Sequence, residues 1–299
     1  MISVDEALSR ILENVEVLEP EEKPILEALG QVLAEDIYAP FDIPPLDNSA
    51  MDGYAVRAED TIGAREDSPV FLRVIGEVAA GRIFPGEVLP GTAVRIMTGA
   101  PLPRGANAVV EFENTDEDER RFSGKPLTDI GILHEASKGL NVRYAGEDIA
   151  RGSLVLPKGK ILRPQEIGVL ASIGRERVRV IRRPVVAVLS TGDELVDLGG
   201  ELEPGKIYNS NTYSIAAQVK KYGGIPKVLG IAPDDFSTLS RKLTEGMDAD
   251  LFLTSAGVSR GEYDMVKDVL AHEGDITFWT VRMRPGKPLA FGILRKEGE

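Results

Sequence analysis

"PVVAVLSTGDEL", residues 184–195, is an unbroken apolar run that ends in a glycine followed by two carboxylates. An apolar run without alternation is typical of a strand that is buried on both faces of a sheet. Apolar strands and amphipathic helices alternate after it, at 211–224, 226–232, 236–246, 249–255, 265–274 and 276–283. This alternation predicts βαβ units with right-handed crossovers, and therefore a doubly wound parallel sheet over residues 181–299.

The composition excludes several classes of function. The chain has 299 residues and a net charge of -13, which argues against nucleic-acid and anionic-membrane partners because both need a basic surface. It contains no cysteine and two histidines, which excludes disulfides, thiolate metal sites and cysteine nucleophiles. The first residues, "MISVDEALSR", carry charge early and contain no long apolar run, so we expect a cytoplasmic protein.

Residues 1–180 have a different sequence pattern. Short β-type runs with glycine- and proline-bearing turns predict an inserted small all-β module at 45–140, in which 116–140 is expected to be an exposed loop or hairpin excursion. Residues 1–44 and 141–180 are expected to form a linking domain of helices and strands. One of its helices starts after Ser3, and another runs from Pro164 to Gly174. The predicted fold class is thus α/β and β multidomain.

Arginines cluster between residues 175 and 183. They could form an anion-binding patch, but Arg177 and Arg179 alternate with valines as the exposed face of a strand does. The residues therefore favour a solvated strand face over a binding site.

The loops that follow the predicted strands carry the candidate chemistry. Ligands of an open parallel sheet bind outside the carboxyl ends of its strands. The residues that fall there are Glu194 after the first strand, Asp234 after the second, Ser255, Gly257, Ser259 and Asp264 after the third, and Arg284 and Lys287 after the last. Small residues before a helix can approach a phosphate, neighbouring carboxylates can hold Mg²⁺, and Arg284 with Lys287 can attract a second anion.

Each of these signals also has a purely structural interpretation. A glycine between a strand and a helix is often structural, "GDEL" can cap a turn, paired aspartates are commonly solvated, and "YNSN" at 208–211 fits a helix N-cap. Their coincidence on one predicted edge favours a site that binds phosphate, a metal ion and an oxyanion. No Ser-His-Asp order, Walker loop or paired-histidine motif is present.

"PLDNSAMDGYAVR", residues 45–57, places Asp52 in a Met-Asp-Gly turn that runs into a predicted strand. Asp-Gly between apolar residues is an ordinary hairpin turn, so these residues alone favour a structural aspartate. The predicted site for phosphate and a metal ion, at the carboxyl ends of the parallel strands, is a surface toward which the Asp52 carboxylate could project.

The ordered motifs resemble one known family. "LDNSAMDGYAVR", "IMTGAPLPRGANAVV", "NVRYAGEDI", "LSTGDEL", "NSNTYSIAAQVKKYGG", "SAGVSRGEYD" and "RPGKPLAFG" are similar, in this order, to the molybdopterin molybdenumtransferases, the MoeA family, which includes the E domain of gephyrin. The resemblance covers essentially the whole chain, and its last domain resembles the MogA and MoaB proteins of the same pathway.

The resemblance implies a transferase of molybdenum cofactor biosynthesis. Such an enzyme inserts molybdate, or the nearly isosteric tungstate, into adenylylated molybdopterin with the help of Mg²⁺ and releases AMP. It implies a homodimer, with the upstream adenylyltransferase as a possible partner. By resemblance, Glu194, Asp234 and Asp264 would handle the adenylate and Mg²⁺, Arg284 and Lys287 would attract molybdate, and Asp52, Thr98 and Asp148 would take part in catalysis.

The chain departs from the family pattern in several places. Ala256 stands where a glycine is usual, Arg260 where a small apolar residue is common, and Arg284 where a lysine precedes "PGKP". The family continues into a further C-terminal β domain, so we expect this chain to lack that part and to transfer metal poorly alone. Two alternatives stay open: a non-catalytic scaffold with the same fold, and a molybdopterin adenylyltransferase, which would lack the β module.

Overall fold

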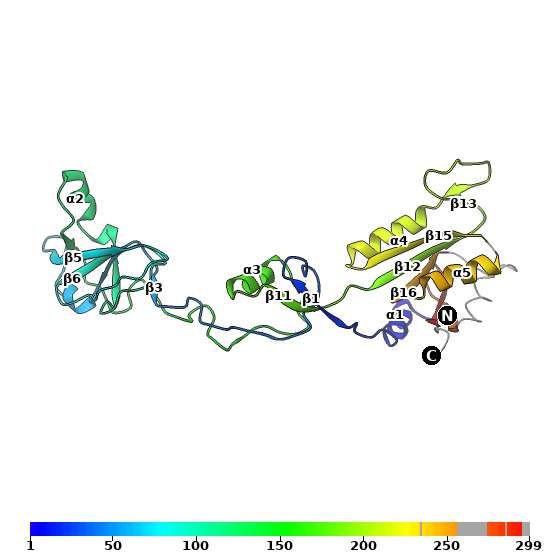
Figure 1. Ribbon diagram of the computed structural model, residues 1–299, viewed down its shortest axis with the longest axis horizontal. Coiled ribbons are helices and arrows are strands. Elements are labelled where there is room, and N and C mark those ends of the chain that lie inside the picture. The colour runs from blue at the N-terminus through cyan, green and yellow to red at the C-terminus, as the bar shows by residue number, and fades with distance from the viewer. Residues whose placement is uncertain (234, 256–273, 285, 295–299) are drawn as a thin grey trace. The chain divides into compact units, whose positions relative to one another are not determined.

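The computed structural model describes residues 1–233, 235–255, 274–284 and 286–294 (Figure 1). These residues form two compact units. We call residues 1–34, 159–164 and 177–299 the α/β unit, and residues 35–158 and 165–176 the β unit. The three-part division predicted above stays a prediction.

A parallel sheet of three strands forms the centre of the α/β unit. Its order is β15 (Ile225–Ala232), β12 (Val185–Thr191) and β16 (Leu251–Ser255). The crossovers contain α4 (Ser210–Lys221) and α5 (Phe236–Gly246), which begin at the capping residues Asn209 and Asp235. Both helices pack on β15, and the βαβ rhythm predicted from the sequence is confirmed over residues 185–255. All but the last residue of the helix predicted at 265–274 lies outside the described residues.

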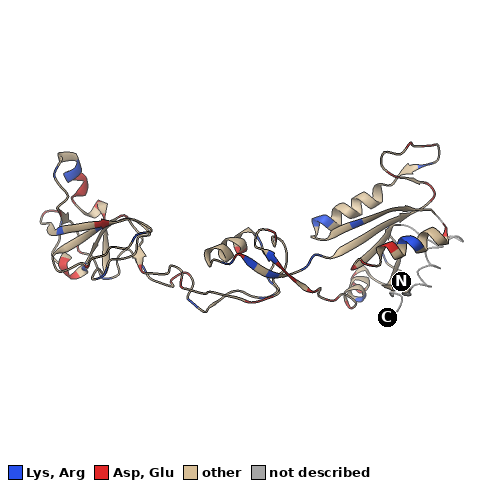
Figure 2. Ribbon diagram, in the orientation of Figure 1, with Lys and Arg blue, Asp and Glu red and all other residues tan. Residues whose placement is uncertain are grey.

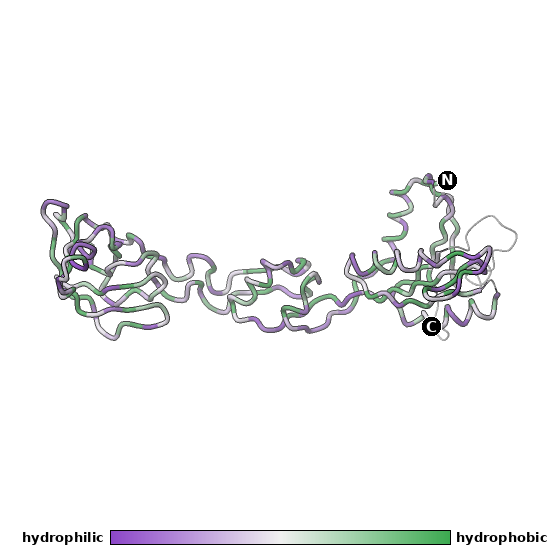
Figure 3. Tube along the Cα trace, turned by 90° about the horizontal axis from the view of Figure 1, so that it is seen from above, coloured by the Kyte–Doolittle hydropathy of each residue, from purple (hydrophilic) through white to green (hydrophobic). Residues whose placement is uncertain are grey.

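The two helices cover opposite faces of this sheet (Figure 1). Ala187 and Leu189 of β12 pack with Leu239 and Leu243 of α5 in one apolar core. Because side chains alternate along a strand, Ser190 points to the other face, where it contacts α4. Hydrophobic stretches follow the strands and hydrophilic stretches follow the turns (Figure 3). The unit is therefore doubly wound, as predicted.

The last predicted strand does not extend this parallel sheet. β17 (Gly274–Thr280) pairs antiparallel with β18 (Pro288–Leu294). Residues 281–287 separate the two strands, a connection too short for the crossover that a parallel pair needs. Ile276 and Leu294 of this pair pack on the core beneath α5.

The remaining elements of the α/β unit are short. α1 (Val4–Leu12) begins at Ser3, whose hydroxyl accepts a hydrogen bond from the Glu6 amide, as the capping box predicts. β1 (Pro20–Pro24) pairs antiparallel with β11 (Arg177–Ile181), and β13 (Leu195–Val196) pairs parallel with β14 (Ile207–Tyr208). The structure also confirms the second predicted helix, α3 (Pro164–Ser172), which lies in the β unit apart from its first residue.

A five-stranded sheet dominates the β unit. Its order is β7 (Ala108–Glu111), β4 (Gly53–Val56), β6 (Thr92–Ile96), β5 (Val70–Val78) and β8 (Asp129–Ile132). Apolar cores lie on both faces, one around Tyr54 and Ile130, the other around Ala55 and Ile96. The unit also contains α2 (Glu117–Ser123) and two short 3-10 helices, η1 (Ala58–Thr61) and η2 (Phe112–Asn114).

The prediction for residues 116–140 was wrong. Instead of an exposed loop, this stretch supplies α2 and the edge strand β8, and Ile130 and Ile132 are fully buried. A single glycine separates the two isoleucines, so the apolar alternation is too short to stand out among the charged residues around it.

Two antiparallel stretches connect the sheet of the β unit to the rest of the chain. β2 (Ile37–Tyr38) pairs with β10 (Leu154–Leu156), and β3 (Asn48–Ser49) pairs with β9 (Val142–Arg143). Three aspartates also accept hydrogen bonds from backbone amides of the opposite stretch. They are Asp36 from Lys158, Asp42 from Arg151, and Asp47 from Ala145, at 2.6–2.8 Å. These turn-type aspartates therefore tie the two stretches together.

Charged residues of both signs are interspersed along the chain (Figure 2). The arginines near 180 are paired, since Arg175 binds Glu35, Arg177 binds Glu22, and Arg182 binds Glu19 and Asp250. This supports the solvated-face interpretation over an anion patch. Among the described residues, no helix is long and apolar enough to cross a membrane.

Candidate functional site

Three hydroxyls meet at the carboxyl end of the parallel sheet. The Ser190 Oγ, at the end of β12, lies 2.6 Å from the Thr212 Oγ1 of α4 and 2.7 Å from the Ser255 Oγ of β16. Ser190 and Thr212 are fully buried. Ser255 was predicted as a binding residue from its place after a strand, and the hydroxyl chain joins it to the first turn of α4.

Asn209 completes this hydroxyl cluster. Its side-chain oxygen accepts a hydrogen bond from the Thr212 amide at 3.3 Å and caps α4, as the "YNSN" motif predicts. Asn209 is 1% exposed, yet its Nδ2 has no hydrogen-bond acceptor among the described residues. A buried donor without a partner is costly, so this edge of the sheet can accept a ligand that supplies an oxygen.

The turn after β12 brings the Glu194 carboxylate back over the end of the strand. Gly192 has a φ of +138°, and a Cβ at this position would lie 2.3 Å from Glu194 Oε2. Glycine is therefore required for this arrangement. The carboxylate makes no hydrogen bond or ion pair with the described residues, so it is available to a ligand.

A neighbouring segment holds this turn in place. The Lys206 Nζ donates to the Asp193 carbonyl at 2.6 Å, and the Ile207 amide donates to the Glu194 carbonyl at 2.9 Å. The backbone that carries Glu194 is thus fixed from both sides of that residue.

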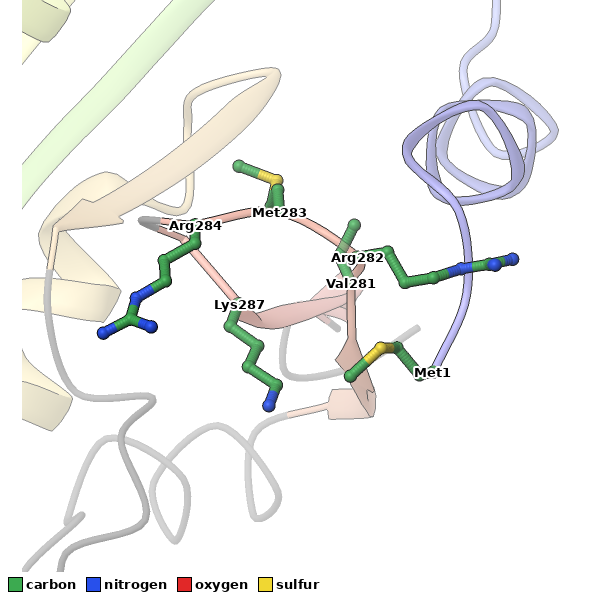
Figure 4. A pocket seen from close by; sticks show the side chains of 6 residues that line it. All are labelled: Met1, Val281, Arg282, Met283, Arg284 and Lys287. Atoms are coloured by element: carbon green, nitrogen blue, oxygen red, sulfur yellow. The ribbon is translucent and has the colours of Figure 1, made fainter.

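Arg284 and Lys287 lie on the turn between β17 and β18, where a shallow pocket opens to solvent. Its lining consists of Met1, Val281, Arg282, Met283, Arg284 and Lys287. The side chains of Arg284 and Lys287 extend to the same side of the turn, whereas Arg282 points away from them (Figure 4). Two cations on one side of this turn suit a tetrahedral oxyanion.

Asp52 and Thr98 form a compact pair in the β unit. Asp52 Oδ1 accepts hydrogen bonds from the Thr98 amide at 2.7 Å and from the Thr98 hydroxyl at 2.8 Å. These bonds, first from the amide and then from the hydroxyl, hold the pKa of Asp52 below its usual value. Asp52 is therefore a turn residue whose exposed carboxylate stays ionised.

Asp148 belongs to a different neighbourhood of the β unit. Its carboxylate accepts a hydrogen bond from Arg143 Nη2 at 2.5 Å, and Glu147 lies beside the same arginine at 3.6 Å. A role in a reaction would therefore require a ligand that competes with Arg143.

The structure brings some predicted residues together and leaves others undescribed. Glu194 and Ser255 follow adjacent strands, and Asp52 contacts Thr98 directly. Asp234, Gly257, Ser259 and Asp264 lie outside the described residues. Within the described part of the chain, no group of three carboxylate or histidine side chains could hold a metal ion.

The sequence analysis did not single out four of the residues described above. Ser190 is the polar end of an apolar strand, Thr212 follows an N-cap, Asn209 was interpreted only as that cap, and Lys206 lies in a polar loop. A hydroxyl at the end of a buried apolar strand is a signal that could have identified Ser190, because a buried hydroxyl needs a partner.

Comparison with protein families gives two adjoining matches. Residues 2–174 match the MoeA N-terminal region (domain I and II), and residues 187–298 match the probable molybdopterin binding domain. The first match covers the β unit, and the second covers the sheet that carries the hydroxyl cluster.

Individual relatives agree with these matches. The chain is 41% identical over 299 residues to molybdopterin molybdenumtransferase 2 of Mycobacterium tuberculosis, covering 98% of this chain and 72% of the relative. It is 38% identical to the molybdopterin molybdenumtransferase of Haemophilus influenzae, covering 98% and 70%.

A solved structure shares the fold. The molybdopterin biosynthesis moeA protein from Pyrococcus horikoshii OT3 superposes with a TM-score of 0.84 at 35% identity, covering 98% of this chain and 72% of that chain. Sequence and structure thus agree over nearly the whole length, and the chain belongs to the MoeA family of molybdopterin molybdenumtransferases.

Proposed function

We propose that the chain catalyses the Mg²⁺-dependent insertion of molybdate into adenylylated molybdopterin with release of AMP, a step of molybdenum cofactor biosynthesis. The observation that carries the proposal is the buried Asn209 donor beside the Ser190, Thr212 and Ser255 hydroxyls at the carboxyl end of the sheet. This edge offers hydroxyls, an amide and a helix N-terminus to a phosphorylated ligand.

The Glu194 carboxylate supports a role for Mg²⁺. Mg²⁺ prefers oxygen ligands and often bridges one or two carboxylates to phosphate. The Glu194 carboxylate lies beside Gly192 and has no hydrogen bond or ion pair within the described part of the chain. By resemblance, Asp234 and Asp264 would complete the set. When bound, the ion would neutralise charge on the leaving phosphate.

The cationic turn supports a role in oxyanion binding. Arg284 and Lys287 would hold molybdate or tungstate, and the two cations contribute differently. The Arg284 guanidinium presents a planar fork to two oxygens, whereas the Lys287 ammonium acts as a compact charge. Molybdate and tungstate carry the same charge and have nearly the same shape, so the two cations would bind either. We propose molybdate because the family is named for molybdenum transfer.

Asp52 and Thr98 would act from the β unit of a partner subunit, as the family resemblance implies. The ionised state of Asp52 supports such a role, because a lowered pKa keeps the carboxylate charged across the neutral range. Roles for Asp148, the homodimer and the upstream adenylyltransferase as partner stay predictions of the resemblance. The cytoplasmic location stays a prediction from the N-terminal residues.

AMP release tests the proposed function. The full chain is incubated with adenylylated molybdopterin, Mg²⁺ and molybdate, and AMP is followed by chromatography. We expect the wild-type chain to release AMP only when Mg²⁺ is present.

Asp52→Asn should lower the rate of AMP release about 100-fold or more, the size of effect seen when a group that stabilises charge in a reaction is removed. Asp60→Asn is the matched control, since Asp60 is an aspartate of the same unit whose carboxylate accepts one amide, that of Gly91, at 2.9 Å. No AMP from the full chain would contradict the proposal.

Gly192→Ala should weaken the binding of Mg²⁺. The new Cβ would displace the Glu194 carboxylate and would also force a side chain onto a φ of +138°. We expect the Mg²⁺ concentration for half-maximal AMP release to rise about tenfold, an effect typical of lost support around a metal ligand. Gly199→Ala, in the nearby loop at a φ of +85° with no neighbour within 4 Å, controls for backbone strain alone. Equal effects of the two substitutions would contradict the role of the carboxylate.

A further inference from the structure

We infer that Arg95 is a positioning residue that holds the Asp52–Thr98 pair in its working geometry. The inference rests on the proposed function, since it names a residue that acts through Asp52. Arg95 lies on β6 and donates to Glu117 of α2, which also accepts a hydrogen bond from Tyr54 of β4. Arg95 was not predicted as a site residue from the sequence.

The strand register places Arg95 close to the pair. Asp52 immediately precedes β4, and Thr98 follows β6 by two residues. These strands are antiparallel, with Gly53 opposite Ile96 and Tyr54 opposite Arg95. The Tyr54–Arg95 pair is thus one register step from the end of the strands at which Asp52 accepts its two hydrogen bonds from Thr98. A shift of β4 along β6 would break both of those bonds.

The Glu117 carboxylate joins β4 to β6 because it accepts hydrogen bonds from both strands. Its Oε2 accepts a hydrogen bond from the Tyr54 hydroxyl at 2.5 Å, and its Oε1 accepts one from Arg95 Nη2 at 3.0 Å. Arg121 adds a third bond to the same carboxylate at 2.6 Å. The Glu117 side chain is 2% exposed, so these partners neutralise a charge that has no access to water.

The guanidinium fits this place better than another cation would. It lies over the Phe112 ring at 4.5 Å from the centroid, and it presents two donors to Glu117 at once. Phe112 in turn donates its amide to the Asp52 carbonyl at 3.3 Å. The planar fork therefore links Glu117, the Phe112 ring and the Asp52 backbone, which a lysine ammonium cannot do.

The charge of Arg95 also acts on Asp52. The charged and titratable groups around Arg95 are Glu117, Tyr54 and Glu77, whose carboxylate lies 3.8 Å from the guanidinium. The two hydrogen bonds from Thr98 lower the pKa of Asp52 most, and the positive charge of Arg95 lowers it further. Because the pKa of Asp52 is lowered, its carboxyl becomes protonated at a lower pH than an ordinary aspartate does. Removing the charge moves this protonation to higher pH.

Two substitutions separate geometry from charge. Arg95→Lys keeps a cation without the fork, and Arg95→Gln removes the charge as well. For AMP release by the full chain, we expect kcat to fall about 10- to 100-fold in both variants, the size of effect that follows a displacement of about 1 Å. The acid limb of the pH profile should move to higher pH in both variants and further in Arg95→Gln, because both loosen the bonds from Thr98 and only Arg95→Gln also removes the charge.

Arg120→Gln is the matched control. Arg120 lies on the same helix as Glu117, binds Asp116 at 2.7 Å and Asp129 at 2.9 Å, and packs over Phe71 of β5. Among the described residues, these partners all lie outside β4 and β6. Arg120→Gln should lower the melting temperature as the Arg95 variants do while leaving kcat and the acid limb unchanged. If kcat falls as much in Arg120→Gln as in Arg95→Gln, the inference is overturned, because reduced stability of the β unit would then explain both losses.

A second measurement does not depend on activity. The ¹³C resonance of the Asp52 carboxyl is titrated in the wild-type chain and in Arg95→Gln, and we expect its midpoint to move to higher pH. An unchanged midpoint together with an unchanged Thr98 amide exchange rate would overturn the positioning role. If the wild-type chain releases no AMP, the proposed function fails, and this titration still decides the role of Arg95.

Discussion

Gly53→Ala should unfold the sheet of the β unit. A Cβ at Gly53 would lie 2.0 Å from the Val110 carbonyl oxygen and 2.8 Å from Glu111 Cα, and both belong to the backbone of β7. Backbone atoms inside a sheet cannot move aside as the end of a flexible side chain can. The central strand β4 would have to separate from its neighbour, which breaks the ladder from Gly53 to Val56. We expect a loss of about 3 kcal/mol or more, at the upper end of overpacking effects.

Urea denaturation followed by circular dichroism measures this loss. The matched control is Gly168→Ala on α3, where the glycine has an ordinary helical φ and no atom lies within 4 Å of the new Cβ. That substitution should raise stability by about 0.5–1 kcal/mol, since alanine favours a helix. A Gly53→Ala chain as stable as the wild type would mean that β4 and β7 are not packed as described.

Glu117→Ala should cost about 3–5 kcal/mol, the usual effect of breaking one side of a buried ion pair. The substitution leaves the Tyr54 hydroxyl and the Arg95 and Arg121 guanidinium groups without their common acceptor. Arg121 is about half exposed and can turn to water, whereas Tyr54 is fully buried and cannot. Burial opposes ionisation of Glu117, but hydrogen bonds from Arg95, Tyr54 and Arg121 outweigh it and hold its pKa below the usual value. The carboxylate is therefore charged at neutral pH in the wild type.

Chemical denaturation at pH 7 again gives the free energy of unfolding. Asp118→Ala is the control, because Asp118 is the next residue on α2, is exposed, and should change stability by less than about 0.5 kcal/mol. Since the pKa of Glu117 is depressed, its contribution is present above its unfolded pKa and disappears as the pH falls through the folded one. The difference between wild type and Glu117→Ala should therefore shrink in acid, and a difference that is constant with pH would contradict this account.

The parallel sheet could be predicted because its signal is local. Val186 to Leu189 form an unbroken apolar run, and the helices after it show a clear apolar period, so strand and helix are each determined within about ten residues. The caps at Ser3, Asn209 and Asp235 follow from the same local chemistry, since each side chain accepts a bond from an amide three residues on.

The candidate site could be predicted only in part. The loops after the strands were identified because parallel strands end at one edge, which points to Glu194 and Ser255 without any coordinates. The partners Ser190 and Thr212 were not identified, because their contact joins residues 22 positions apart and depends on how α4 lies against β12. The edge strand β8 was missed for a related reason: Ile130 and Ile132 are informative only once a sheet provides them with a core.

The sequence by itself determined the secondary structure of the sheet and its helices, their capping residues and the family, because propensity, apolar period and ordered motifs are properties of neighbouring residues. Only the tertiary structure decided that Thr98 donates two hydrogen bonds to Asp52, that Glu117 joins Tyr54 to Arg95, and that the buried Asn209 amide finds no acceptor among the residues that the structure describes. The physical reason is that hydrogen bonding and desolvation depend on distance in space. Tyr54 and Glu117 are 63 positions apart along the chain, yet their oxygens are 2.5 Å apart in the fold.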